Sequence, residues 1–155
     1  MLFLSQLKKN EGVKITIKKR IPVAAGLGGG SSNAASVLLG LNRYYGQPFS
    51  TTQLMSMGLS LGADVPFFVF RKPAIATGIG EKLQAYSGLN PFPVLLIYPG
   101  FTVSTREIYR KLNLRLTKCK KKLRSILLKK SGFDVALHLC NDLETVTASA
   151  YPEIV

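Results

Sequence analysis

Hydrophobic and polar positions alternate along residues 13–19, VKITIKK, near the start of the chain. Val13, Ile15 and Ile17 occupy one side of this alternation, and lysine or threonine occupies the other. A period of two residues is that of a β-strand with one solvated face. The pattern therefore predicts a strand over 13–19, which leads directly into a proline and a run of glycines.

The next part of the chain predicts two helices. From 31 to 45 the apolar residues recur with a helical period over adjoining faces, as in a helix buried over much of its circumference. A second helix is expected to begin at a Ser50 or Thr51 cap and to close at Gly62. Its residues expected in the core are Leu54, Met57 and Leu61.

Later elements are shorter. Gly78 and Gly80 predict a turn between two short strands, and residues 91–100, PFPVLLIYPG, predict a buried strand between prolines. A helix is expected around Ile108. Residues 118–130 carry seven basic residues and no acidic one. This run is typical of a solvated helix face, and the alternative of a nucleic-acid patch lacks aromatic residues for base stacking.

The amino-acid composition limits the kinds of partner that the protein is expected to bind. The 155 residues are 46% hydrophobic, which excludes a disordered chain, and 21 Lys and Arg against 8 Asp and Glu give a net charge of +13 that attracts anions. Cys119 and Cys140, with His138 as the one histidine, lack the spacing of a zinc site, so we expect reduced core thiols. Without a signal peptide or membrane span, we expect a soluble protein of a bacterial cytoplasm or a plastid.

The segment 22–35, PVAAGLGGGSSNAA, places glycines between the predicted strand and helix. A Walker loop requires a lysine after the glycines, and the dinucleotide fingerprint requires a third glycine where Ser31 stands; neither is present. What remains is a glycine loop and two serines at a helix N-terminus, which suits a phosphate. The alternative is a turn that only lets the helix pack against the strand.

This segment resembles the phosphate-binding motif of the GHMP kinases, in which a proline precedes Gly-Leu-Gly and then Ser-Ser-x-Ala. Four further stretches continue the resemblance in the same order: LGADVPFFVF at 61–70, GIGE at 78–81, YPGFTVST at 98–105 and NDLE at 141–144. The resemblance implies an α+β fold. It assigns residues 1–90 to the second half of an N-terminal nucleotide-binding domain and residues 91–155 to the first half of a C-terminal ferredoxin-like domain.

The resemblance also implies a kinase that uses ATP and Mg²⁺ to phosphorylate a small-molecule alcohol bearing a diphosphate, with neither a membrane nor a nucleic acid as partner. Ser32 would contact the metal. Gly78, Ile79 and Thr105 would contact the substrate, although a hairpin turn and a helix cap explain them almost as well. The residues implied at the ATP phosphates are Pro22, Gly26, Leu27, Gly28, Gly29, Gly30, Ser31 and Ser32.

Asp64 is the only acidic residue between Glu11 and Glu81, in an otherwise apolar stretch. A carboxylate buried there would need a partner or a task, because burying it alone is costly. From the residues alone, a cap for a short helix at Asp-Val-Pro and a catalytic group are equally supported. The resemblance implies the catalytic role, with Asp64 as base or electrostatic partner of the substrate hydroxyl.

The resemblance begins in the interior of the family's sequence. Relatives open with a strand whose lysine pairs with the catalytic aspartate, and they close with a third glycine-rich motif near Gly-Thr-Gly-Ala-Cys. We therefore expect an interior piece of a larger kinase that alone folds poorly and phosphorylates little. The competing hypotheses are another GHMP kinase with a different alcohol, and a non-catalytic basic module that binds anions or RNA.

Overall fold

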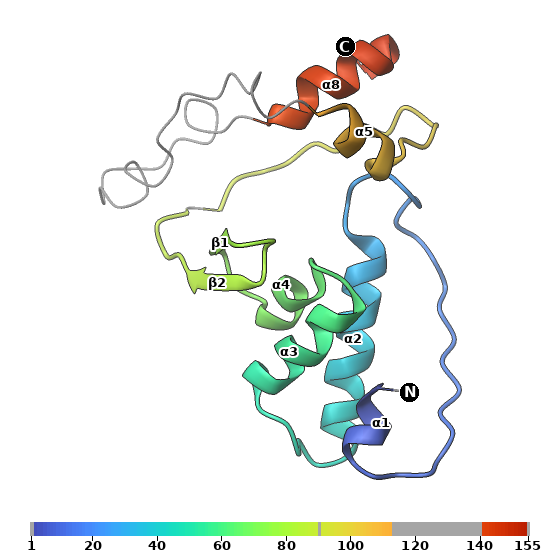
Figure 1. The fold of residues 1–155 in the computed structure, drawn as a ribbon, viewed down its shortest axis with the longest axis vertical. Coiled ribbons are helices and arrows are strands. Elements are labelled where there is room, and N and C mark those ends of the chain that lie inside the picture. The colour runs from blue at the N-terminus through green and yellow to red at the C-terminus, as the bar shows by residue number, and fades with distance from the viewer. Residues whose placement is uncertain (1, 90, 113–140, 155) are drawn as a thin grey trace. The chain divides into compact units, whose positions relative to one another are not determined.

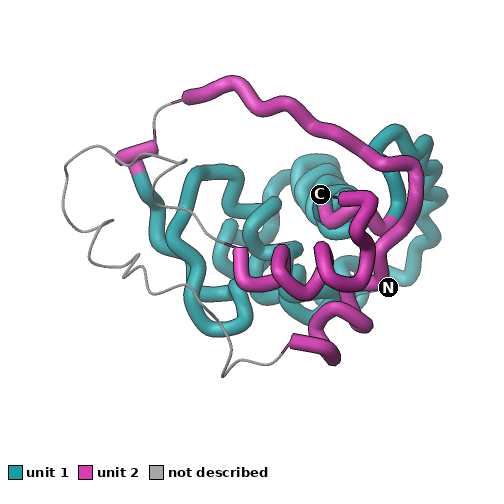
Figure 2. The backbone as a smooth tube through the Cα atoms, turned by 90° about the horizontal axis from the view of Figure 1, so that it is seen from above, with its two compact units in different colours: residues 1–23, 27–86 teal, residues 24–26, 87–155 magenta. Residues whose placement is uncertain are grey.

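The computed structural model describes residues 2–89, 91–112 and 141–154. The chain divides into two compact units, one of residues 1–23 and 27–86 and the other of residues 24–26 and 87–155 (Figure 2). Helices predominate in these described ranges, and one small sheet accompanies them there, which agrees with the α+β class expected from the sequence.

The first unit is built on three helices that pack against one another, α2, α3 and α4 (Figure 1). Its elements are α1 (Leu2–Gln6), α2 (Gly29–Tyr44), α3 (Thr51–Leu61), α4 (Val65–Phe70), β1 (Ala74–Thr77) and β2 (Lys82–Ala85). The core residues are Phe3, Leu4, Ala35, Leu38, Leu54, Met57, Val65 and Val69. Both long helices predicted from the periodicity are therefore confirmed.

Helix α3 begins where the sequence predicts, and Ser50 is its cap. The Ser50 hydroxyl accepts a hydrogen bond from the Gln53 N–H at 3.3 Å, and the Gln53 side chain accepts one from the Ser50 N–H at 2.8 Å. This reciprocal pair satisfies two N–H groups that a helix start leaves open. The expected burial of Leu61 is wrong, since this last residue of α3 is 54% exposed.

Helix α4 approaches α3 closely at Gly58. A Cβ on Gly58 would lie 2.9 Å from Cγ1 of Val65, which is closer than real Cβ contacts. Val65 is itself 1% exposed. The absence of a side chain at residue 58 therefore lets the start of α4 pack onto α3.

Strands β1 and β2 form an antiparallel hairpin in which Ala74 pairs with Ala85 and Thr77 with Lys82. Gly78 and Gly80 lie in its turn with φ of 74° and 110°, a region that favours glycine. The predicted turn between short strands is confirmed.

The two other predicted strands are wrong for the described structure. Neither 13–19 nor 91–100 forms a strand in the described structure, and no hydrogen bond joins their main chain to any described residue. The expected burial of 91–100 is also wrong, since Leu95 is 85% exposed and Ile97 84% exposed. A strand is stable only when a neighbour satisfies its N–H and C=O groups, and these segments have no such neighbour within the described ranges.

The second unit contains α5 (Thr105–Lys111), α8 (Asp142–Ala150) and the 3-10 helix η2 (Pro152–Ile154). Ser104 caps α5, since its hydroxyl accepts a hydrogen bond from the Glu107 N–H at 3.4 Å. The predicted helix around Ile108 is thereby confirmed, with Ile108 3% exposed. The basic run 118–130 lies outside the described residues, as do Cys119, His138 and Cys140.

None of the helices that the structure describes is both long enough and apolar enough to span a bilayer.

Asn42 is a buried polar residue of the first unit, at 7% exposure. Its amide nitrogen donates to the Phe49 carbonyl at 3.0 Å, and its amide oxygen accepts from the Phe49 N–H at 3.0 Å. These two bonds close the connection between α2 and α3. They also satisfy backbone groups that would be costly to leave unpaired.

Asn42→Ala should lower the free energy of unfolding by about 2 kcal/mol, because it removes both hydrogen bonds and leaves the Phe49 backbone unpaired. Asn33→Ala on the same helix should change it by less than about 0.5 kcal/mol. Urea denaturation measures both. Equal effects of the two substitutions would contradict the assigned role of Asn42.

Candidate functional site

The glycine-rich loop enters α2 through residues with positive φ. Ala24, Gly26 and Gly28 have φ of 58°, 72° and 63°, and Gly28 is the N-terminal cap residue of the helix. Only glycine adopts this region without steric cost. The loop therefore needs glycine for its own backbone path at two of the positions that the sequence singled out.

Gly28 has a second reason to be glycine. A Cβ on this residue would lie 2.8 Å from Cζ of Phe68, whose ring comes from α4. The ring thus packs directly against the main chain of the loop, and any side chain at residue 28 would displace it. The absence of a side chain at residue 28 therefore lets the loop pack against α4.

Gly29 lies beside a cation that the sequence analysis missed. A Cβ on Gly29 would lie 3.4 Å from the Nζ atom of Lys19 and 3.2 Å from Cγ2 of Ile21. Lys19 occupies the apolar side of the alternating segment 13–21, where a charged side chain breaks the pattern. This break in the pattern was the signal that the sequence offered for Lys19. In the structure the Lys19 ammonium group lies at the start of α2.

The start of α2 has the properties of an anion site. The N–H groups of Gly29, Gly30 and Ser31 have no hydrogen-bond partner in the described structure, whereas the Ser32 N–H donates to the Gly28 carbonyl at 2.8 Å. The first turn contains no acidic residue. Open N–H groups and the partial positive charge of a helix terminus together attract phosphate, and Lys19 adds to this field.

Gly30 leaves the space above this terminus open. Apart from its chain neighbours and the nearby backbone of α2, no described atom lies within 4 Å of the position that its Cβ would occupy. Packing therefore does not require glycine here, in contrast to Gly28. An open position next to free N–H groups is what close approach of a ligand needs.

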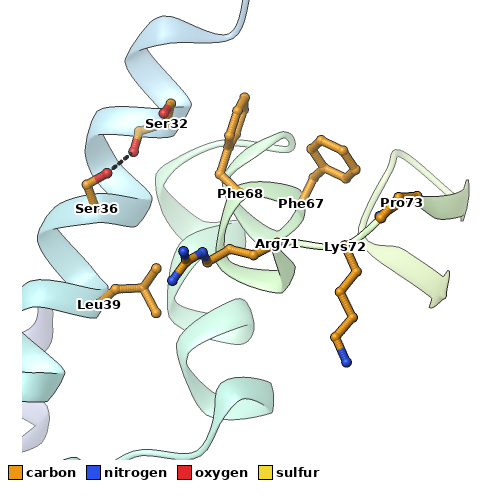
Figure 3. A pocket seen from close by; sticks show the side chains of 8 residues that line it. All are labelled: Ser32, Ser36, Leu39, Phe67, Phe68, Arg71, Lys72 and Pro73. Carbon is orange, nitrogen blue, oxygen red and sulfur yellow. Dashed lines mark hydrogen bonds between the residues drawn. The ribbon is translucent and has the colours of Figure 1, made fainter. Parts of the chain in front are cut away.

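The two serines after the glycines are half-buried. The Ser32 carbonyl accepts a hydrogen bond from the Ser36 hydroxyl at 2.9 Å, and the Ser32 hydroxyl has no bond to any described residue (Figure 3). Ser32 and Ser36 line an open cleft of about 680 Å³ between α2 and the end of α4. Its other lining residues are Leu39, Phe67, Phe68, Arg71, Lys72 and Pro73.

The cations of this cleft are oriented differently. Figure 3 shows Arg71 reaching from the end of α4 towards Leu39 on α2, whereas Lys72 extends away from α2. Arg71 adopts φ of 55° as the residue that ends α4. The cleft therefore combines apolar walls, the Arg71 guanidinium and the free hydroxyl of Ser32.

Asp64 stands at the N-terminal cap position of α4, yet its side chain makes no capping hydrogen bond. Asp64 is exposed, so the expected burial of its carboxylate is wrong. The carboxylate therefore needs no partner to offset a cost of burial. Asp64 precedes Phe68 by four residues, a spacing that places two side chains on one face of a helix. Because Phe68 contacts Gly28, this face of α4 is the one turned towards the glycine loop.

The remaining candidates lie elsewhere. Gly78 and Ile79 are in the β1–β2 turn, where the Ile79 N–H donates to the Glu81 carboxylate at 2.7 Å. A phosphate at this turn would have to displace that carboxylate. Thr105 is the first residue of α5 in the second unit, and Ser104 is the cap of that helix.

The hydrogen bonds of the β1–β2 turn predict that its stability depends on pH. Hydrogen bonds from the N–H groups of Glu81 itself and of Ile79 lower the pKa of the Glu81 carboxyl. Because the folded pKa lies below the unfolded one, the turn is stabilised above the unfolded pKa, and this contribution is lost as pH falls through the folded pKa.

An NMR titration of the Glu81 carboxyl should therefore give a pKa below the ordinary glutamate value of about 4.3. The Ile79 amide resonance should shift over the same pH range, and Glu81→Gln should abolish that shift. A Glu81 pKa at or above the ordinary value would contradict the hydrogen bond.

Comparisons with known proteins agree with the resemblance to the GHMP kinases. The family described as "GHMP kinases N terminal domain" matches residues 1–72. The 4-diphosphocytidyl-2-C-methyl-D-erythritol kinase of Syntrophotalea carbinolica is 53% identical over 92% of this chain and 50% of its own length. The kinase of the same name from Syntrophus aciditrophicus is 54% identical over 92% of this chain and 51% of its own length.

A solved structure, the crystal structure of 4-(cytidine 5'-diphospho)-2C-methyl-D-erythritol kinase, superposes with a TM-score of 0.70 at 34% identity. The superposition covers 98% of this chain and 55% of that one. The chain thus spans about half the length of the relatives it matches. The family match, the relatives and the solved structure together show that the chain belongs to the GHMP kinase family.

Proposed function

We propose that this chain carries the ATP-phosphate site and the catalytic aspartate of a kinase that phosphorylates the 2-hydroxyl of 4-diphosphocytidyl-2-C-methyl-D-erythritol, in the non-mevalonate isoprenoid pathway. The observation that carries the proposal is the start of α2, with three unpartnered N–H groups, a nearby lysine and no acidic residue. The names of the relatives support this substrate over another small alcohol. Their bacterial sources support a bacterial cytoplasm over a plastid.

The loop would hold the triphosphate of ATP through its main chain. The N–H groups of Gly29, Gly30 and Ser31 are available to phosphate oxygens, and the Lys19 ammonium lies close enough to add charge. Pro22, Gly26 and Leu27 would act by shaping the path of the loop. Phosphoryl transfer requires chiefly such positioning and electrostatic stabilisation.

Mg²⁺ would be held by Ser32 together with the phosphates. The described residues contain no group of three or more His, Cys, Asp or Glu that could hold a metal. Mg²⁺ is commonly bound by few protein ligands plus substrate phosphates and water, so a single free hydroxyl fits. The ion would neutralise charge on the transferred phosphoryl group.

Asp64 would accept or position the proton of the substrate hydroxyl. Its carboxylate is exposed and makes no capping bond, and Asp64 precedes by four residues Phe68, whose ring packs against Gly28. Gly78, Ile79 and Thr105 would contact the substrate. In this proposal residues 1–90 belong to the nucleotide-binding domain and residues 91–155 to the ferredoxin-like domain.

Gly30→Ala should weaken MgATP binding by at least tenfold, because the methyl group occupies open space beside the free N–H groups. It should not lower stability, since alanine is the better helix former and nothing lies within 4 Å. The matched control is Gly40→Ala, which fills equally open space later in α2. Titration with a fluorescent ATP analogue measures both, and equal affinities of the two variants would contradict the phosphate site.

Asp64→Asn should lower kcat by at least about 100-fold, the usual contribution of a positioned acid or base. We would measure it in a chimera in which this chain replaces the matching half of the Syntrophotalea carbinolica relative. MgATP affinity should stay within threefold, and Asp142→Asn in the second unit should keep the activity. A fully active Asp64→Asn chimera would exclude the catalytic role while leaving the phosphate site intact.

A further inference from the structure

The turn of the β1–β2 hairpin lies beside the segment that leads into α4. A Cβ on Gly80 would lie 3.9 Å from the carbonyl oxygen of Ala63, the residue that precedes Asp64. The hairpin and α4 both belong to the first unit. The turn that contains Gly78 and Ile79, which are proposed to contact the substrate, therefore borders the segment that carries the proposed catalytic aspartate.

The Glu81 carboxylate fills the inside of this turn. One of its oxygens accepts a hydrogen bond from the Ile79 N–H at 2.7 Å. Both oxygens lie 2.5 Å from the position that a Cβ on Gly78 would occupy, so the carboxylate takes the place of a side chain there. Gly78 has φ of 74°. The absence of a Cβ on Gly78 therefore serves both its backbone conformation and its contact with Glu81.

The hydrogen bond between Ile79 and Glu81 is not needed to close the hairpin. The Gly80 N–H donates to the Thr77 carbonyl at 3.2 Å, and four residue pairs join the two strands. Ile79 is 72% exposed, and within the described ranges the Glu81 carboxylate is the hydrogen-bond partner of its N–H. Glu81 therefore fixes the tip of the turn, residues 78–79, and not the pairing of the strands.

We propose that Glu81 is a positioning residue for the phosphoryl acceptor. Its carboxylate holds the tip of the turn beside the segment of Ala63 and Asp64, so the substrate meets a contact that is already ordered. Binding then avoids the cost of ordering the tip. The inference rests on the proposed function, and it adds a residue that acts through the turn without touching the reacting atoms.

A competing role for Glu81 predicts the opposite effect on substrate binding. A substrate phosphate that bound the Ile79 N–H would have to displace the carboxylate. Removal of the carboxylate would then free this donor and remove a negative charge, so the substrate KM would fall. The positioning role predicts that the same change raises the substrate KM, because the tip of the turn is no longer held.

The test uses the chimera in which this chain replaces the matching half of the Syntrophotalea carbinolica relative. Glu81→Ala should raise the KM for 4-diphosphocytidyl-2-C-methyl-D-erythritol at least about tenfold, the usual effect of losing a hydrogen bond to a charged group. It should leave kcat and the KM for MgATP within about threefold, because the contact concerns substrate binding alone.

Two further variants separate positioning from charge and from loosening of the hairpin. Glu81→Gln keeps an acceptor oxygen for the Ile79 N–H, so its substrate KM should stay within about threefold of the parent chimera. The matched control is Gln84→Ala, which removes an exposed side chain from β2 and should leave the substrate KM unchanged.

Each other outcome overturns the positioning role of Glu81. An unchanged or lower substrate KM in Glu81→Ala would exclude it, and equal rises in Glu81→Ala and Glu81→Gln would assign the effect to charge. A parallel rise in the MgATP KM, or the same rise in Gln84→Ala, would show a general loosening of the structure. An inactive parent chimera would overturn the proposed function and this inference together, whereas an active one with no effect of Glu81→Ala overturns this inference alone.

Discussion

The ring of Phe68 lies against the main chain of Gly28, in space that a side chain at residue 28 would fill. This contact joins α4 to the glycine loop at the start of α2. Helix α4 is in turn fixed on α3 by Val65, which packs over Gly58. Two glycines without side chains thus determine where the loop and Asp64 lie with respect to the helical core.

The electrostatic character of the site follows from this packing. The loop reaches α2 with its first N–H groups free, and no carboxylate occupies the first turn to neutralise them. Lys19 approaches the same point from the preceding segment. An anion bound there would gain from main-chain donors, the helix terminus and one ammonium group.

Local features of the sequence predicted local structure well. The period of α2, the Ser50 cap of α3 and the glycine turn of the β1–β2 hairpin each depend on residues close in the chain, and the structure confirms them. The strands over 13–19 and 91–100 fail because a strand depends on a neighbour. The alternating pattern shows which face of the segment is apolar and favours burial. It does not show which strand would pair with the segment.

In the candidate site, too, some features could be predicted from the sequence and others only from the structure. The glycine motif marked the loop, yet only the structure distinguishes Gly28, which packing requires, from Gly30, which packing leaves free. Lys19 could not be assigned from its position in the chain, because its approach to Gly29 depends on the path of the intervening loop. The exposure of Asp64 was mispredicted because an apolar stretch need not be buried at the start of a helix.

The proposed role of the glycine loop depends on phosphate binding to the open N–H groups at the start of α2. The most direct measurement is an amide NMR titration of this chain with MgATP, with adenosine as the control. If phosphate binds there, the largest shifts fall on Gly29, Gly30 and Ser31, and adenosine does not reproduce them. Unchanged resonances at these three amides, or equal shifts with adenosine, would contradict the account.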